Sequence, residues 1–327
     1  MPADDFYRSA VPYANLIKGL PKNSTPFFSP VLDGLQIPTY LAEWLEPFTS
    51  LPVTDFAELT SRKHTDHCQR CYAQALVCNR PPSFPMMGEI GGDPCTVAKE
   101  IVRHFLGPSA LQEPRDVPFR QQQIPKLKVL FIDRASAHSR KILNAGKLVE
   151  VCNKWQPKDF PALQMECGSI DFAGLPTKSL LESLKDVDIL IGTHGAGLIN
   201  GFFLSEGSSI VEVLPYGFRG GWPDLYFRGP YQKANCTFYF SLEIDAPHYS
   251  KPGNNEIRNP LQLLENNTTP VEWATAQMTW ARDRNSIVTW RVLDEIFQTI
   301  LGLDKNKSAY AALENYTFSQ SREEENM

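Results

Sequence analysis

A histidine and two glycines, His194, Gly195 and Gly197, end an apolar run in DILIGTHGAGLINGFFLSEGSSIVEVLP at residues 188–215, and the apolar run at its end contains one glutamate, Glu212. Gly195 and Gly197 carry no side chain that would keep an anion from the backbone, and the free N–H groups of a helix beginning there favour phosphate. Glu212 follows at the end of the next apolar run, where a carboxylate can hold the two hydroxyls of a ribose. The spacing predicts a nucleotide diphosphate site, with further contacts expected from Ala196, Leu198 and Asn200.

His194 stands inside this glycine turn, and its ring can donate a hydrogen bond to a phosphate oxygen of a leaving diphosphate. The alternative is a loop histidine that hydrogen-bonds a backbone carbonyl. The turn reads GTHGAG, which differs from the G-x-G-x-x-G of dinucleotide enzymes. An α/β dehydrogenase that uses a nicotinamide or flavin is therefore disfavoured.

A second group of polar residues follows another apolar run, in FIDRASAHSRKILN at residues 131–144. Arg134 comes directly after a predicted strand, and Arg140 and Asn144 follow on what is expected to be the adjoining helix. Two guanidinium groups beside a diphosphate would neutralise the charge that develops on a leaving group, without a metal ion. The alternative is an exposed helix start with solvated charges.

The residues around both groups alternate between buried-strand patterns and helical periodicity. Strands are predicted at 126–133, 160–167, 187–194 and 208–215, and helices at 94–107, 136–155 and 175–186. Such alternation predicts an α/β fold with a parallel sheet and right-handed crossovers. Because ligands bind at the carboxyl ends of such strands, the arginines and the glycine turn are expected at the same edge of the sheet.

The pattern divides the chain into four parts. Residues 1–119 are rich in proline and form a short N-terminal domain of unassigned topology, and residues 120–283 form a Rossmann-like domain. An amphipathic helix is predicted at 284–302, with Gly302 as its C-cap. The polar stretch at 303–327 is expected to be a mobile tail.

Composition excludes some classes of function. The net charge is −5 and there is no basic stripe, so nucleic acid is not an expected partner. No segment has the length and hydropathy of a membrane helix, and the N-terminus lacks the layout of a signal peptide. Sequons are nevertheless more frequent than the roughly two expected by chance, which favours a lumenal protein. They lie at Asn23, Asn235, Asn266, Asn267, Asn306 and Asn315.

The seven cysteines do not settle the compartment, because an odd number leaves at least one unpaired. Cys68 and Cys71 have the C-x-x-C spacing of half a zinc site, and Cys78 follows closely. A second pair of ligands is missing, which favours a structural disulfide or buried thiols. No D-x-D triplet offers a metal–diphosphate handle.

The motifs closely resemble those of glycosyltransferase family 61. The family carries H-G-A-G-L-T-N followed by a Phe-Leu pair and a strand ending in V-x-E-x-x-P, and residues 194–215 match this signature. Its upstream R-x(5)-R-x-I-x-N element matches Arg134, Arg140, Ile142 and Asn144. The segment CYAQALVC is similar to the family's Cys-aromatic segment.

The resemblance implies an inverting glycosyltransferase that takes a sugar from a UDP-sugar and attaches it to a hydroxyl of a glycan or glycoprotein. Relatives transfer N-acetylglucosamine, xylose or arabinose in the Golgi or endoplasmic reticulum, and they are membrane-anchored. It also implies a GT-B architecture, in which two Rossmann-like domains face a cleft. Residues 1–119 would then be the acceptor side, short for such a domain, and residues 120–283 the nucleotide-sugar side.

This chain departs from the family pattern in two respects. Ile199 replaces the usual threonine of the glycine turn, and the helix before the signature lacks the Glu-Gln pair that relatives often show. A catalytically degenerate relative that only binds nucleotide is therefore an alternative to an active transferase.

Arg134, Arg140 and His194 are predicted to stabilise the leaving group. The sequence does not identify the catalytic base, the sugar or the acceptor. Candidate bases near strand ends and in the N-terminal domain are Asp133, His138, Glu166, Asp171, Asp66 and Glu89.

Overall fold

The computed structural model describes the sheet domain and parts of the N-terminal region. The described residues are 27–28, 39–49, 54–55, 93–111, 117–122, 125–219, 223–253 and 277–321. The remaining positions lie outside them, and so do the predictions that fall there: the cysteines at 68, 71 and 78, the base candidates Asp66 and Glu89, and the sequons at 23, 266 and 267.

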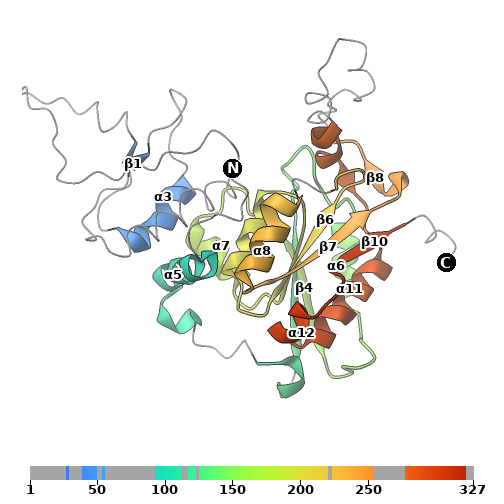
Figure 1. Cartoon of the computed structure of the whole chain (residues 1–327), viewed down its shortest axis with the longest axis horizontal. Coiled ribbons are helices and arrows are strands. Elements are labelled where there is room, and N and C mark those ends of the chain that lie inside the picture. Colours follow the sequence, from blue (N-terminus) through green and yellow to red (C-terminus); the bar gives the residue numbers. More distant parts are fainter. Residues whose placement is uncertain are drawn as a thin grey trace, which may run out of the picture.

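A six-stranded sheet forms the centre of the molecule, and each strand runs parallel to its neighbours (Figure 1). Its strands are β3 (Lys126–Ile132), β4 (Gln164–Ile170), β5 (Ile189–Thr193), β6 (Ser209–Leu214), β7 (Phe238–Ile244) and β10 (Thr317–Gln320). The four predicted strands are among them, so the α/β fold with a Rossmann-like parallel sheet is confirmed. One sheet of this kind lies within the described residues, and the two-domain GT-B arrangement stays a prediction.

The strand order β10-β7-β6-β5-β3-β4 determines where a ligand can bind. The chain passes from β3 to one side for β4 and then returns to the other side for β5. The loops that follow β3 and β5 therefore leave the sheet on opposite sides of a topological switch point. In doubly wound sheets, the crevice at such a point is where ligands bind.

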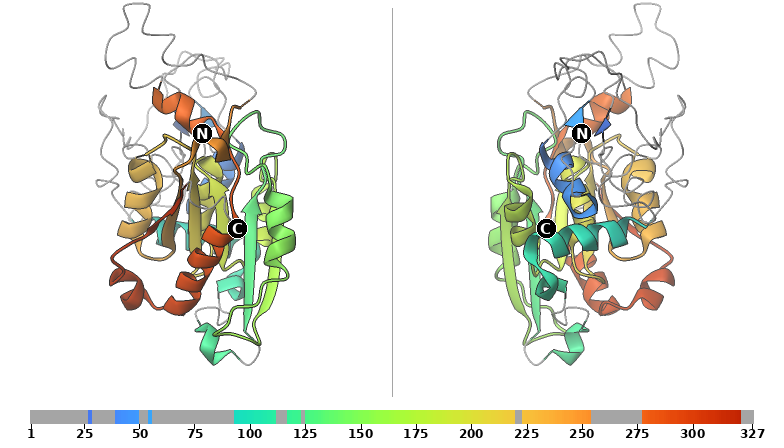
Figure 2. Two further views of the ribbon diagram at one scale, coloured as in Figure 1. Left: turned by 90° about the vertical axis from the view of Figure 1, so that its right-hand side faces the viewer. Right: turned by 90° about the vertical axis from the view of Figure 1, so that its left-hand side faces the viewer.

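Helices cover both faces of the sheet, as the two side views show (Figure 2). One face carries α3 (Thr39–Leu45), α5 (Pro94–Leu106), α7 (Thr177–Leu184), the 3-10 helix η7 (Ala196–Phe203) and α8 (Gly229–Ala234). The other carries α6 (Ala145–Cys152), α11 (Trp290–Leu303) and α12 (Lys307–Ala311). Both faces of the central strands are thus buried, which explains their continuous apolar sequences.

Shorter elements complete the described structure. β1 (Phe27–Phe28) pairs with β2 (Thr54–Asp55), and β8 (Ser250–Lys251) pairs with β9 (Asn285–Ser286). Further short helices include η3 (Glu46–Phe48), η5 (Pro108–Leu111), η6 (Phe119–Gln121), the π-helical η8 (Asp224–Arg228) and η9 (Pro247–Tyr249), and residues 277–282 are also helical.

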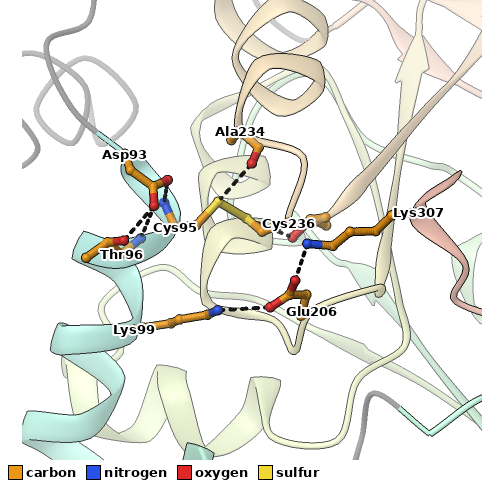
Figure 3. Close-up of polar contacts among 9 residues, drawn as sticks. Asp93, Cys95, Thr96, Lys99, Glu206, Ala234, Cys236 and Lys307 are labelled. Carbon is orange, nitrogen blue, oxygen red and sulfur yellow. Dashed lines mark hydrogen bonds and ion pairs between the residues drawn. A yellow bond between two sulfur atoms is a disulfide. The ribbon is translucent and has the colours of Figure 1, made fainter. Parts of the chain in front are cut away.

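Helix α5, which the predicted boundary at 119/120 assigns to the N-terminal part, packs against one face of the sheet. Its Ala98 and Ile101 side chains are fully buried in the core beneath α7 and η7. A disulfide between Cys95 and Cys236 ties the start of α5 to the residues before β7 (Figure 3). Lys99 of α5 and Lys307 of α12 both pair with Glu206 in the same region, so a disulfide and an ion pair of Lys99 attach α5 to the segments next to the sheet.

The helix predicted at 136–155 is shorter in the structure and occupies only Ala145–Cys152. The residues before it form turns, in which Arg140 adopts a left-handed backbone with φ of 59°. Such a conformation ends any helical path, because an L residue adopts it only singly. Arg140 therefore lies in a loop and not on the adjoining helix.

The C-terminal helix is confirmed, but its boundaries differ from those predicted. α11 begins at Trp290, because Asn285 and Ser286 pair as strand β9. It continues through Gly302 to Leu303, and Asp304, in the left-handed region with φ of 52°, is the C-cap.

Part of the predicted polar tail is a structural element of the sheet. After α12, residues Thr317–Gln320 pair with β7 as the edge strand β10. Gln320 is fully buried, and its side chain bonds the backbone of Ile287 and Thr289 ahead of α11. Polar composition does not reveal this strand, because an edge strand needs little apolar surface.

Candidate functional site

Gly195 is the point at which the two predicted groups of residues meet. A Cβ atom at this position would lie 3.1 Å from Nη1 of Arg134 and 3.4 Å from Nη1 of Arg140. The backbone of Gly195 is extended, with φ of 165°, so glycine is needed for this close approach and not for an unusual conformation. The structure thus brings Arg134, Arg140 and the glycine turn together at the switch point between β3 and β5.

The loop after β3 is fixed so that Arg140 faces this turn. The Thr193 hydroxyl, at the end of β5, donates a hydrogen bond of 2.5 Å to the backbone carbonyl of Arg140. The Nε atom of Arg140 lies 3.4 Å from Oδ1 of Asp283, which also accepts two hydrogen bonds from Arg282. A segment far along the chain therefore contributes a carboxylate to the site.

The two guanidinium groups form a partly desolvated pair of like charges. Burial lowers the pKa of Arg134, an effect that the charges of Asp171 and Asp283 oppose. The pKa of Arg140 is lowered to about 10, mainly by burial. The charges of Arg134 and Arg282 lower this pKa further, and the charge of Asp283 raises it. Both groups remain cations at neutral pH.

The Nε atoms of both arginines are buried and make no hydrogen bond within the described part of the chain, although that of Arg140 lies 3.4 Å from the Asp283 carboxylate. A buried donor without an acceptor costs about 1–3 kcal/mol. Two adjacent cations with unused donors favour the binding of an anion, because it would neutralise their repulsion and accept their hydrogen bonds.

His194 and Glu212 are in direct contact in the interior of the protein. Nδ1 of the imidazole lies 2.5 Å from Oε1 of the carboxylate, and Glu212 is fully buried. The Tyr239 hydroxyl donates to the other oxygen, Oε2, at 2.5 Å. Both oxygens of Glu212 are thus occupied inside the protein. Glu212 lies within β6 and not at its end, and it binds the histidine. Its predicted contact with a ribose stays a prediction.

The His194 ring is enclosed by aromatic side chains. Its centroid lies 4.6 Å from that of Phe218 and 5.3 Å from that of Phe227, and Tyr226 lies farther away at 6.2 Å. Tyr226 and Phe227 come from the π-helical η8, and such distortions are frequent at functional sites. These contacts restrict the positions that the imidazole can adopt.

The segment after the turn is a 3-10 helix, where a helix with free N–H groups was predicted. The Leu198 N–H donates to the Gly195 carbonyl at 3.0 Å, so the amides of Ala196 and Gly197 precede the first internal hydrogen bond. The Leu198 amide is therefore engaged within the helix, and the predicted contact of Leu198 with the donor stays a prediction. Asn200 is buried, with 4% of its surface exposed.

The side chain of Asn144 makes hydrogen bonds to the backbone next to the site. Its Nδ2 donates to the Val288 carbonyl at 2.7 Å, and its Oδ1 accepts from the Val288 N–H at 3.1 Å. The side chain therefore fastens the start of α6 to the segment before α11. Its predicted contact with the donor stays a prediction.

The base candidates differ in position. Glu166 is paired with Lys126 and lies opposite Lys128 near the amino ends of the strands, far along β3 from the glycine turn, so the prediction that it lies near the carboxyl end is wrong. Asp171 follows β4 at the correct edge and accepts hydrogen bonds from the Ala173 amide and the Ser136 hydroxyl, which lower its pKa.

The other described candidates, Asp133 and His138, lie in the loop after β3, and His138 is exposed. No group of three or more His, Cys, Asp or Glu side chains in the described residues could hold a metal ion.

Three site residues were not found from the sequence. Tyr239 lies within an apolar strand and resembles a core residue, and Phe218 and Asp283 are distant from the motifs. Tyr239 could have been identified as a tyrosine on the strand next to Glu212 and on the same face of the sheet. This requires a prediction of β7, which the sequence pattern does not provide.

A family model described as Glycosyltransferase 61 matches residues 94–211. This match confirms the family resemblance, and it covers Arg134, Arg140, His194 and the glycine turn. It implies glycosyltransferase activity. A comparison with curated proteins gives no match. Within the described residues, no helix has the length and hydropathy needed to span a membrane.

Proposed function

From the match to glycosyltransferase family 61 over residues 94–211, we propose that this chain is an inverting glycosyltransferase that uses a UDP-sugar. Its acceptor is a hydroxyl of a glycan or glycoprotein, and the sugar is xylose, arabinose or N-acetylglucosamine. The proposal includes the GT-B architecture of the family, in which the six-stranded sheet is the nucleotide-sugar domain.

The observation that carries this proposal is the approach of two guanidinium groups to Gly195. The Arg134 and Arg140 Nη1 atoms lie 3.1 and 3.4 Å from the position that a Cβ of Gly195 would occupy. A diphosphate at the switch point would meet both cations and the amides of Ala196 and Gly197 together. Such an arrangement suits an anion with several oxygens better than a neutral ligand.

The proposed reaction is a single displacement at the anomeric carbon. A base removes the proton of the acceptor hydroxyl, the acceptor oxygen forms a bond to the carbon, and the bond to the diphosphate oxygen breaks on the opposite face. The electron pair of that bond leaves with UDP. Arg134, Arg140 and His194 stabilise the growing negative charge, so protein cations perform a task that a metal ion performs in other transferases.

We propose the lumen of the secretory pathway as the site of action. Two disulfides support this location, Cys95–Cys236 and Cys152–Cys167, because disulfides persist in oxidising compartments. Three sequon asparagines in the described residues, Asn235, Asn306 and Asn315, are also exposed and could carry glycans.

The test combines binding and turnover. The purified protein, expressed through the secretory pathway, is titrated with UDP, UDP-xylose, UDP-arabinose, UDP-N-acetylglucosamine and NAD in the presence of EDTA, and release of UDP from each sugar is followed. His194→Ala is compared with His104→Ala, a matched control on the exposed side of α5.

We expect UDP to bind, one sugar nucleotide to release UDP, and only His194→Ala to impair both. Binding without release in the presence of acceptors would indicate a degenerate relative. Absence of uridine nucleotide binding, or preference for NAD, would contradict the proposed site.

A further inference from the structure

The structure contains a buried chain of three side chains, His194, Glu212 and Tyr239, which we call the buried triad. We propose that Glu212 and Tyr239 are positioning residues that set the orientation and tautomer of His194. The inference rests on the proposed function for its consequence in catalysis, but its structural part is independent of any ligand.

Hydrogen-bond chemistry assigns the protons in the buried triad. An ionised carboxylate only accepts hydrogen bonds, and both oxygens of Glu212 have a partner at 2.5 Å. Tyr239 donates to Oε2, and Nδ1 of His194 must donate to Oε1. Nδ1 therefore carries a proton in both the neutral and the charged imidazole, and Nε2 is left for the diphosphate.

Burial of Tyr239 keeps it a donor at every pH at which the protein would be assayed. Burial raises the pKa of Tyr239 well above its usual value, and the charge of Glu212 and the hydrogen bond to it act in the same direction. The Glu212 carboxylate therefore always has one donor from β7, which leaves only Oε1 for the histidine.

The sheet fixes the backbone that carries the buried triad. Glu212 lies between Gly192 and Ser241 in the register of β5, β6 and β7, and the His194 amide donates to the Val213 carbonyl at 3.0 Å. The rings of Phe218 and Phe227 then limit rotation of the imidazole. The position of Nε2 thus follows from the sheet and requires no ordering when substrate binds.

A carboxylate without a role would be costly at this location. Glu212 has no exposed surface, and a buried charge is stable only when it is hydrogen-bonded. A simple apolar residue would serve packing on β6 equally well. The alternative is that the buried triad only stabilises the fold. In that case the tautomer of His194 has no consequence for catalysis, and the experiments below distinguish the two roles.

The first measurement is nitrogen NMR of the wild-type protein labelled with 15N-histidine, with the His194 signals identified by their loss in His194→Ala. Long-range couplings report which ring nitrogen carries the proton. We expect a protonated Nδ1 across the pH range in which the protein is folded. A neutral ring with a bare Nδ1 would overturn the proposal without reference to any ligand.

The second measurement uses Tyr239→Phe, with Tyr316→Phe as the matched control. The control likewise removes one tyrosine hydroxyl. The Tyr316 hydroxyl donates to the Tyr310 carbonyl and lies outside the buried triad. We expect Tyr239→Phe to alter the His194 nitrogen signals and to lower kcat about tenfold or more, as loss of an orienting partner does elsewhere. Tyr316→Phe should do neither.

The two proposals fail in different ways. If wild type binds and turns over a UDP-sugar and Tyr239→Phe retains wild-type kcat and nitrogen signals, the positioning role is refuted while the function stands. If wild type binds no uridine nucleotide, the proposed function fails, and the NMR result still decides whether Glu212 and Tyr239 set the tautomer. Should Tyr239→Phe not fold, the wild-type tautomer alone decides that question.

Discussion

Replacing Gly201 by alanine should destabilise the protein strongly, because the 3-10 helix η7 is built against two buried side chains. The added Cβ would lie 2.4 Å from Cγ2 of Ile210 and 2.5 Å from the hydroxyl oxygen of Tyr231, both fully buried. Overpacking of this kind costs about 1–3 kcal/mol. That hydroxyl also donates to the Leu198 carbonyl at 2.7 Å, and losing this buried bond costs about 1–3 kcal/mol more.

The expected decrease in the free energy of unfolding is therefore about 2–6 kcal/mol, measured by urea denaturation with the m-value held common. Gly302→Ala is the matched control, because no atom lies within 4 Å of its added Cβ in α11. It should increase the free energy of unfolding by about 0.5–1 kcal/mol. A Gly201→Ala protein that unfolds at the wild-type urea concentration would refute the reasoning about η7.

Three further perturbations follow from buried groups. Burial raises the pKa of Tyr231 and Tyr239 well above the ordinary 10, so above about pH 10 the unfolded chain loses these protons first and stability should fall as the pH rises; a urea midpoint unchanged from pH 8 to 11 would contradict this. Loss of the Cys95–Cys236 disulfide in Cys236→Ser should cost about 2–5 kcal/mol of stability, and reductant should lower the urea midpoint of wild type but have a smaller effect on the variant. Asn144→Ala should cost about 1–3 kcal/mol, because two hydrogen bonds to the backbone ahead of α11 are lost; calorimetry showing an unchanged Tm would exclude that role.

The sequence predicts those parts of the fold in which local pattern and burial agree. Continuous apolar runs identify β3, β5 and β6, because strands covered on both faces exclude polar residues. The edge strand β10 was missed, since TFSQ has no such pattern and gains its order from pairing with β7. The start of α6 is predicted too early, because apolar residues recur at helical spacing in the sequence before Ala145, where the structure forms turns.

The candidate site shows the same limit. That Arg134, Arg140 and the glycine turn lie together follows from the rule that parallel strands share a carboxyl edge. The partners of Glu212 do not follow from it, because they depend on register between β6 and β7. The sequence therefore predicts Glu212 at the end of a strand, whereas the residue lies within β6. Asp283 reaches Arg140 through a chain segment for which no sequence pattern predicts a location.

The most direct test of the central claim, a diphosphate site at the switch point, is calorimetric titration of UDP and UMP into wild type and Arg140→Ala. Arg291→Ala is the control, since this exposed arginine lies on α11. A charged hydrogen bond contributes about 1.5–3 kcal/mol, so wild type should bind UDP roughly 10–150 times more tightly than UMP. We predict that Arg140→Ala abolishes most of this preference and that Arg291→Ala preserves it. Equal affinity of wild type for UDP and UMP, or an unchanged preference in Arg140→Ala, would contradict the account.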